Sequence, residues 1–162
     1  MKRAWQDVLD TFHYGIYLIT IAADGSYNGM IASWVTQCSH DPALVAVAVR
    51  NNRLSRSQIL NAGNFAINVL AEDALDSIKK FKIPDWKRKF DDVAFGLSPG
   101  GNPVLDQALG YLDCEVESTV ATGDHTLFIA RIQAGELSRG GSRSHQITME
   151  GSTGGRLKRS SS

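Results

Sequence analysis

The sequence has few cysteines, no surplus of charge and no long hydrophobic run. Its two cysteines, Cys38 and Cys114, lack CxxC spacing, so they predict neither a zinc site nor a rubredoxin-type iron site. We expect both thiols to be reduced, as is typical of a cytoplasmic protein. Lys and Arg total 17 and so do Asp and Glu, so the net charge predicts no nucleic-acid or membrane partner.

Signals for export and for membrane insertion are missing as well. The longest apolar run, residues 43–49, is far too short to span a bilayer. The opening stretch MKRAWQDVLD has two basic residues but no apolar run behind them, so it does not match a secretory signal. We therefore expect a cytoplasmic protein.

Motifs that bind nucleotides or metals are also missing. The sequence has neither G-x-G-x-x-G nor G-x-x-x-x-G-K-[ST], and its four histidines are not spaced as metal ligands. Residues 96–100, GLSPG, match the hydrolase pattern G-x-S-x-G. In that pattern the residue after the serine donates its N–H to the oxyanion, and Pro99 has no N–H to donate. These residues therefore predict a loop rather than a nucleophile.

The hydrophobic pattern indicates a single domain built mainly of strands. Hydrophobic residues make up 43% of the chain and charged residues 21%, which is typical of a globular domain. We expect strands over 15–22, 44–49, 65–70, 110–121 and 125–134. We expect short helices over 3–12, from a Ser55–Gln58 capping box to Gly63, and over 73–80, with a polar loop over 82–92.

Because strands and helices do not alternate regularly, a doubly wound sheet is not expected. An antiparallel barrel, closed or half closed and with peripheral helices, fits this order. We place the domain at residues 1–137. Residues 138–162 are rich in Gly, Ser and Arg, and we expect them to form a tail in which Ile147 and Met149 could make a last short strand.

The expected helix after residue 53 has the features of an anion site. Its first turn carries Ser55, Arg56 and Ser57, and helix N-termini with hydroxyls and a cation nearby bind phosphates well. Taken alone, the stretch favours an ordinary capped helix with a solvated arginine. The basic run 87–89 could add positive charge, although a basic loop balanced by nearby aspartates is more often a solvated surface.

Small and hydroxylic residues fill the stretch NGMIASWVTQCSHDP, residues 28–42, between two β-prone segments. A planar heteroaromatic ligand needs small side chains that let it approach the backbone, and Trp34 could cover a ring face. A twisted strand that packs tightly against a neighbour would need the same small residues. The stretch alone leaves both interpretations open.

Six blocks, in the same order along the chain, resemble the flavin reductase-like, FMN-binding split-barrel family. The blocks are residues 29–42 with Leu44-Val45, Ser55-Arg56 before Ile59, 65–70, Lys89-Phe90, 114–117 and 123–128. The resemblance implies a mainly β fold, a six-stranded antiparallel split barrel with short peripheral helices. It also implies a homodimer that binds FMN, with FAD as the alternative, near the subunit interface.

The resemblance also implies which residues form the site. Residues 32–35 would contact the ribityl and phosphate side of the flavin, 37–39 would line the isoalloxazine edge, and Ser55 with Arg56 would hold the phosphate. The turn Gly123-Asp124-His125 would lie where nicotinamide approaches. The implied cofactor-binding residues are Ala32, Ser33, Trp34, Val35, Gln37, Cys38, Ser39, Ser55, Arg56, Ser57 and Lys89.

The implied function is an NAD(P)H-dependent flavin reductase, in which the flavin carries the hydride chemistry and His125 orients or polarises the nicotinamide. The alternative is an FMN-binding electron carrier that serves a separate redox protein and does not react with nicotinamide. A third possibility is a split-barrel module that binds flavin or haem for storage or sensing.

Overall fold

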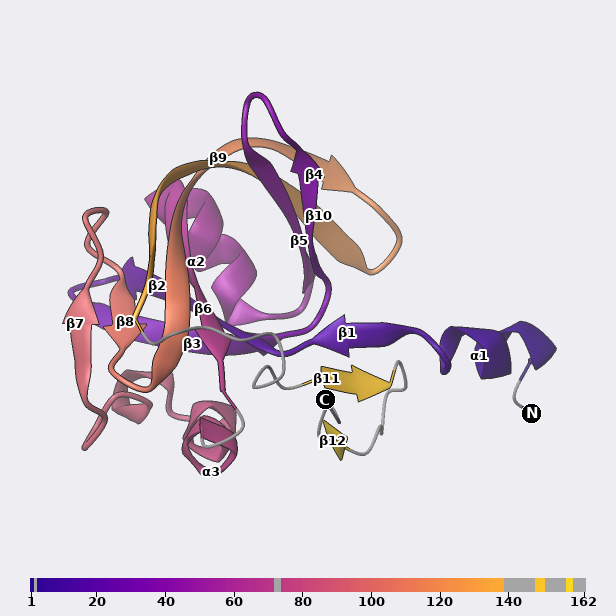
Figure 1. The fold of residues 1–162 in the computed structure, drawn as a ribbon, viewed down its shortest axis with the longest axis horizontal. Coiled ribbons are helices and arrows are strands. Elements are labelled where there is room, and N and C mark those ends of the chain that lie inside the picture. The colour runs from indigo at the N-terminus through magenta and orange to yellow at the C-terminus, as the bar shows by residue number, and fades with distance from the viewer. Residues whose placement is uncertain (2, 72–73, 139–147, 151–156, 159–162) are drawn as a thin grey trace.

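The computed structural model describes residues 1, 3–71, 74–138, 148–150 and 157–158, and antiparallel strands dominate it (Figure 1). The main elements, in chain order, are α1 (Ala4–Leu9), β1 (His13–Gly15), β2 (Tyr17–Ala23), β3 (Ser26–Ala32), β4 (Val35–Ser39), β5 (Leu44–Arg50), α2 (Leu54–Ala62), β6 (Asn64–Leu70), α3 (Leu75–Ile78), two 3₁₀ turns called η2 (Lys79–Lys82) and η3 (Trp86–Arg88), β7 (Phe95–Leu97), β8 (Pro103–Leu105), β9 (Ala108–Ala121), β10 (His125–Leu137), β11 (Thr148–Glu150) and β12 (Leu157–Lys158).

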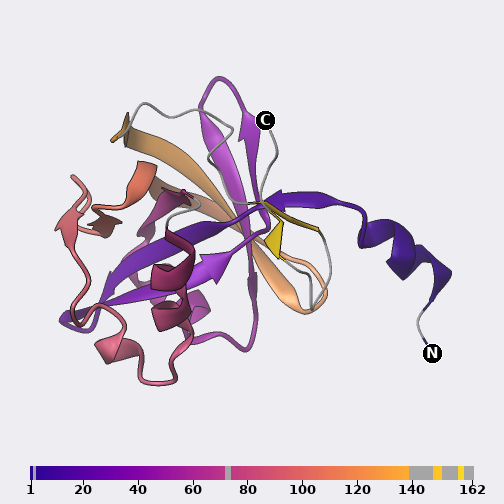
Figure 2. The same ribbon diagram turned by 60° about the horizontal axis from the view of Figure 1, so that its bottom comes forward.

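The main sheet has seven strands in the order β3-β2-β6-β9-β10-β5-β4. Its two edge strands, β3 and β4, are neighbours in the chain and are joined only by Ser33 and Trp34. A two-residue connection can join opposite edges only if the sheet curls, and this curl makes the barrel (Figures 1 and 2). The sheet has seven strands, one more than the resemblance implied. Residues 28–42 contribute to two of them, since they include the end of β3 at one edge and all of β4 at the other.

The expected strands are present, and β9 and β10 are the longest. They form a hairpin that contains two compensating bulges, at Glu117 on β9 and at Gln133 on β10. Because each strand has one extra residue, the register before the first bulge returns after the second. The buried strand expected at 44–49 is β5, whose Val45, Val47 and Val49 face the core.

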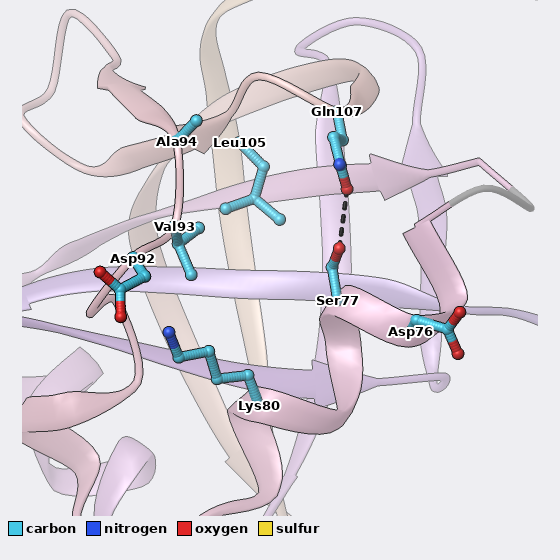
Figure 3. Close-up of a pocket in the computed structure, with 8 residues that line it drawn as sticks. All are labelled: Asp76, Ser77, Lys80, Asp92, Val93, Ala94, Leu105 and Gln107. Carbon is cyan, nitrogen blue, oxygen red and sulfur yellow. Dashed lines mark hydrogen bonds between the residues drawn. The ribbon is translucent and has the colours of Figure 1, made fainter.

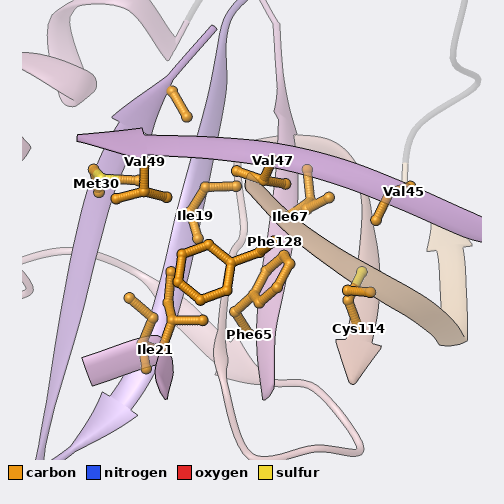
Figure 4. Close-up of a cluster of buried hydrophobic side chains, with 13 residues drawn as sticks. Ile19, Ile21, Met30, Val45, Val47, Val49, Phe65, Ile67, Cys114 and Phe128 are labelled. Carbon is orange, nitrogen blue, oxygen red and sulfur yellow. The ribbon is translucent and has the colours of Figure 1, made fainter. Parts of the chain in front are cut away.

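Two clusters of hydrophobic side chains form the core. The first fills the barrel around Phe65 and Phe128 (Figure 4). The second lies between β2 and the segment that contains α3, η2 and η3, and it includes Phe81 and Phe90. The expected polar loop over 82–92 therefore contains a 3₁₀ turn and one buried aromatic ring, because Phe90 packs edge-on against Phe81.

The helices differ from the sequence-based expectation in how they begin. Helix α2 ends at Gly63 with φ 74°, as expected, but Arg53 is its N-cap residue. The expected capping box is wrong, because Ser55 is buried within the first turn and Gln58 accepts a hydrogen bond from Asn28 at 2.6 Å. The helix expected over 73–80 is observed as α3 followed by η2, and residues 72–73 lie outside the described residues.

The terminal segments are only partly described. The helix expected over 3–12 is observed as α1, and no residue of α1 is buried. In the expected tail, Met149 lies in β11 and pairs with Tyr14 of β1, whereas Ile147 lies outside the described residues. The boundary at residue 137 coincides with the end of β10 and stays a prediction. Among the helices that the structure describes, none has the length and apolar character needed to cross a bilayer.

A fully buried amide, Asn68, connects three strands. Its Nδ2 donates to the carbonyl of Leu18 at 3.3 Å and to that of Pro103 at 3.2 Å, and its Oδ1 accepts from the N–H of Leu105 at 2.9 Å. Buried polar groups that lose such partners cost free energy because water cannot replace them. Asn68 therefore holds β8 against β2 and β6.

We predict that Asn68→Ala lowers the free energy of unfolding by about 2–3 kcal/mol, because it leaves the N–H of Leu105 without an acceptor. In a domain of this size the melting temperature should fall by roughly 5–10 °C. Asn64→Ala on the same strand is the matched control, since Asn64 makes an exposed hydrogen bond to Gly100. Equal losses in the two variants, measured by urea unfolding, would contradict a special role for Asn68.

Candidate functional site

The small-residue stretch 28–42 divides into a part that packs against protein and a part that is exposed. A Cβ on Gly29 would lie 2.7 Å from the Phe81 ring, and Ala32 belongs to the barrel core. For these two residues, tight packing explains the small side chains. After the Ser33-Trp34 connection, Thr36, Gln37 and Cys38 are exposed. Only this second part offers a surface to a ligand.

The exposed part is β4, which lies at the edge of the main sheet beside β5. An edge strand presents backbone N–H and C=O groups that no neighbouring strand of its sheet uses. The Gln37 side chain donates to the carbonyl of Ser39 at 3.2 Å, and a bulge interrupts the β4–β5 pairing between these two residues. Residues 35–39 could therefore contact the edge of a planar ligand.

The start of α2 carries a concentration of positive charge. The Lys89 ammonium donates to the carbonyl of Gly29 at 2.9 Å. Burial, and after it the positive charge of Arg53, lower the pKa of Lys89. Gly29 follows Asn28, which donates to Gln58 of α2 at 2.6 Å, so Lys89 lies near this helix. Arg53 is the N-cap residue of α2, where the first backbone N–H groups have no partner within the helix. The two cations and these N–H groups form a suitable seat for an anion.

Arg56 connects the start of α2 to the turn between β9 and β10. Its Nε donates to the hydroxyl of Thr126 at 2.8 Å, and that hydroxyl donates to the side chain of Asn51 at 2.8 Å. The backbone N–H of Asn51 donates to the carbonyl of Asp124 at 2.9 Å. The helix start and the 123–125 turn therefore form one hydrogen-bonded unit.

His125 is held from two sides. Its Nδ1 contacts the carboxylate of Asp124, and this hydrogen bond, followed by attraction to the ring, lowers the pKa of Asp124. The ring of Trp34 lies 4.6 Å from the imidazole, between centroids, and is tilted by 33°. The His125 side chain is only 11% exposed, although Trp34 is 47% exposed. Its position in a turn is therefore fixed rather than free.

The structure brings some of the predicted residues together and separates others. Trp34, Arg56 and His125 lie at one end of β5, since His125 pairs with Arg50. Ser39 pairs with Leu44 at the other end of β5, so Cys38 and Ser39 lie roughly 15–20 Å from that cluster along the strand direction. A single ligand that contacts both groups must lie along the strands.

Three residues of this cluster, Asn51, Arg53 and Thr126, were not among the sequence-based candidates. Asn51 and Arg53 lie close in sequence to Ser55, and Thr126 directly follows His125. Their closeness in sequence to the predicted residues was the one feature that could have identified them as site residues. Their roles depend on the pairing of β5 with β10, which no local pattern predicts.

Two surface cavities lie away from these residues. One, of about 290 Å³, is lined by Lys80, Asp92, Leu105 and neighbouring residues (Figure 3). The other, of about 390 Å³, lies beside β7 and β9. None of the predicted site residues lines either cavity. The hydrogen-bonded cluster, in contrast, combines positive charge, exposed backbone and a fixed imidazole.

Ser98 of the hydrolase-like match has a structural role. Its hydroxyl donates to the carboxylate of Asp113 at 2.8 Å, and the same carboxylate accepts from the N–H of Gly100. Both side chains are buried, so residues 98–100 form a loop fastened to β9, whereas Gly96 and Leu97 of the expected loop lie in β7. Among the described residues, no group of three or more His, Cys, Asp or Glu side chains is arranged to bind a metal.

The chain resembles known proteins along most of its length. A family model described as flavin reductase like domain matches residues 9–150. A flavin reductase from Pseudomonas putida is 31% identical over 127 residues, which cover 78% of this chain and 74% of that protein. A high molecular weight rubredoxin from Moorella thermoacetica is 34% identical over 128 residues, which cover 76% of this chain and 56% of that protein.

A solved structure also has the same fold. The nitrilotriacetate monooxygenase component B homolog from Mycobacterium thermoresistibile superposes with a TM-score of 0.83 at 25% identity, and the match covers 95% of this chain and 86% of that one. This chain spans between 22% and 56% of the length of the first curated relatives that it matches.

We predict that a thiol reagent distinguishes the two cysteines. Cys38 is exposed, whereas Cys114 is buried, and burial followed by the charge of Asp113 raises the Cys114 pKa to about 12. Ellman's reagent at pH 8 should therefore titrate one thiol per native chain and two after unfolding in guanidinium. Cys38→Ser should abolish the reaction of the native chain. Two fast thiols in the native protein would show that β9 does not protect Cys114.

Proposed function

Because this chain belongs to the flavin reductase like family, we propose that it is an FMN-binding oxidoreductase that takes electrons from NAD(P)H. The observation that carries the proposal is the positive charge around α2, where Arg53 is the N-cap residue and the Lys89 ammonium donates to Gly29 at 2.9 Å. Arg56 connects this helix start to the turn that holds His125. The Pseudomonas relative, which is named a flavin reductase, supports the same reaction class.

The phosphate of FMN would lie at the start of α2. One N–H of the Lys89 ammonium is used by Gly29, which leaves two further donors for an anion. Arg53, the first-turn N–H groups and the largely buried Ser55 hydroxyl complete a donor set that suits a phosphate, whereas the Ser57 hydroxyl already donates to the carbonyl of Leu54 at 2.9 Å. A phosphate of FAD could use the same donors, so FAD is the second candidate cofactor.

The isoalloxazine ring would extend from this seat along β4. Ala32, Ser33, Trp34 and Val35 lie at the point where the chain passes from β3 to β4, and the backbone of residues 37–39 is at the exposed edge. Such an edge can donate and accept hydrogen bonds in the plane of a heteroaromatic ring. The strand direction would set the orientation of the ring.

When bound, the flavin supplies the redox chemistry by accepting a hydride from the nicotinamide. The chain's own residues would bind and orient the two ligands. If Nδ1 of His125 donates to Asp124, its Nε2 is the ring atom available to the nicotinamide. Gly123 leaves the turn open beside it. His125 would then position the nicotinamide rather than transfer a proton.

An electron carrier is the second candidate, and the rubredoxin named above is the observation that favours it. This chain aligns with 56% of that protein, so the matching segment there accompanies further sequence. Cys38 is exposed and Cys114 is buried in the barrel, so these thiols cannot jointly bind a rubredoxin-type iron. A redox partner of this type would therefore be a separate protein or segment.

We further propose that the protein is a homodimer. On the outward face of the sheet, Ala48 of β5, Leu127 of β10 and Val120 of β9 lie side by side, and Val120 is 47% exposed. A second subunit could cover this apolar row. Flavins in an exposed site also need protection from solvent, and a second subunit could provide it.

We predict that Lys89→Met weakens FMN binding by at least tenfold, because one charge-assisted hydrogen bond contributes about 1.5–3 kcal/mol. Lys87→Met is the matched control, since Lys87 is exposed. Fluorescence titrations with FMN and with riboflavin, which lacks the phosphate, measure the effect. The pKa of Lys89 is lowered, so FMN affinity in the wild type should fall with rising pH before ordinary lysines titrate. Equal affinities for FMN and riboflavin would show that the start of α2 does not bind the phosphate.

We predict that His125→Ala slows the reduction of bound FMN by NAD(P)H several-fold, because it removes one positioning hydrogen bond worth about 1 kcal/mol. FMN affinity should change little. Anaerobic stopped-flow traces near 450 nm compare the two proteins. Matching rates would make His125 an ordinary turn residue. No reduction in either protein would favour the electron carrier.

A further inference from the structure

Two buried amides connect helix α2 to strand β3. The side chains of Asn28 on β3 and Gln58 on α2 are 1% and 4% exposed. Asn28 Nδ2 donates to Gln58 Oε1 at 2.6 Å, and each amide has one atom left over, Asn28 Oδ1 and Gln58 Nε2, that finds no partner among the described residues. No other fully buried side-chain nitrogen or oxygen of the described chain lacks a partner.

The pair cannot satisfy its own hydrogen bonds in either orientation. If both amides were turned over, Gln58 Nε2 would donate to Asn28 Oδ1, and the two opposite atoms would be left over instead. A buried donor or acceptor without a partner destabilises the folded state, whereas two apolar side chains of the same shape would not. The pair therefore lowers the stability of the fold.

The surroundings of the pair are apolar. Ile21 lies opposite Asn28 in the β2–β3 ladder, and Met30 faces the same side of β3. Both belong to the core cluster shown in Figure 4, as does Ile59, which follows Gln58. Packing alone would favour apolar side chains at positions 28 and 58. Two incompletely bonded amides in such a place indicate a role other than stability.

On the strand side, the pair lies next to the residue that holds Lys89. The carbonyl of Gly29 accepts a hydrogen bond from the Lys89 ammonium at 2.9 Å. Successive residues of an extended strand are under 4 Å apart, roughly, so the contact with α2 and the contact with Lys89 are made by adjoining parts of β3. Any shift of β3 relative to α2 would move Lys89 as well.

On the helix side, the pair lies one turn from the start of α2. Gln58 follows Ser55 by three residues, and both are buried on the same face of the helix. A hydrogen bond from Gln58 to β3 limits how far α2 can slide or rotate against the strand. It therefore fixes the direction of the Ser55 side chain and of the first-turn N–H groups.

We propose that Asn28 and Gln58 are positioning residues, whose hydrogen bond sets the spacing between the Lys89 ammonium and the start of α2 so that both reach one flavin phosphate. The inference rests on the proposed FMN site. Charge-assisted hydrogen bonds depend steeply on distance, and donors that are already in place need no ordering when the phosphate binds. The chain retains two unsatisfied atoms because their amides improve flavin binding.

The double variant Asn28→Leu/Gln58→Met tests the proposal, since these side chains resemble the two amides in shape but do not hydrogen bond. Its melting temperature, measured by circular dichroism without flavin, should equal or exceed that of the wild type. Its FMN affinity should fall by about fivefold or more, while riboflavin affinity stays unchanged. Fluorescence titrations measure both affinities. A double variant that keeps the wild-type preference for FMN over riboflavin would contradict the positioning role.

The Lys89→Met background distinguishes positioning from a purely structural effect. If the pair acts through Lys89, adding Asn28→Leu/Gln58→Met to Lys89→Met should change the FMN Kd by less than about twofold. Effects that multiply would show that the pair does not act through Lys89. Asn61→Met is the matched control on the same helix, because Asn61 is exposed, and it should leave both the melting temperature and the flavin affinities unchanged.

Failure of the phosphate site and failure of the positioning role give different results. A wild type that binds FMN no better than riboflavin would overturn the phosphate site, and the positioning role with it. A wild-type preference for FMN that survives in the double variant would overturn the positioning role alone. If the double variant does not fold, Gln58→Asn replaces it, because the side chain is one methylene shorter and no longer reaches Asn28.

Discussion

The two-residue connection Ser33-Trp34 is the constraint on which the rest of the structure depends. It joins strands at opposite edges of a seven-stranded sheet, so the sheet has to curl until those edges approach each other. The curl encloses Phe65 and Phe128 on the inside. It also directs Trp34 outward to the imidazole of His125. The same short connection therefore determines both the core and one wall of the candidate site.

The sequence predicts the strands well because burial imposes a period of two on each of them. Val45, Val47 and Val49 alternate with alanines, and this pattern needs no knowledge of the partner strand. The helix caps were harder to predict. Ser55 and Gln58 have the spacing of a capping box, but Asn28 on a distant strand binds Gln58 instead. A tertiary contact thus overrides a local motif that would otherwise be satisfied.

In the candidate site, too, some residues can be identified from local sequence patterns and others only from the pairing of distant strands. Arg56 and His125 were accessible from sequence blocks, because each lies in a recognisable local pattern. Thr126 and Asn51, which connect them, become visible only when β5 is aligned with β10. The significance of Arg53 similarly depends on Lys89, which follows α2 and β6 in the chain and returns to donate to Gly29. The site residues that the sequence did not predict are therefore those whose positions depend on the pairing of strands that are distant in the chain.

The paired bulges of the β9–β10 hairpin mark where this chain can change length. Glu117 and Gln133 are exposed, one on each strand, and each is the extra residue of its bulge. Because neither residue pairs across the ladder, losing either one would remove its bulge and leave every remaining pair in place. Losing a paired residue of the same strand would instead slip the register and turn apolar side chains to the wrong face. Relatives of this hairpin are therefore expected to gain or lose residues at these two positions rather than between them.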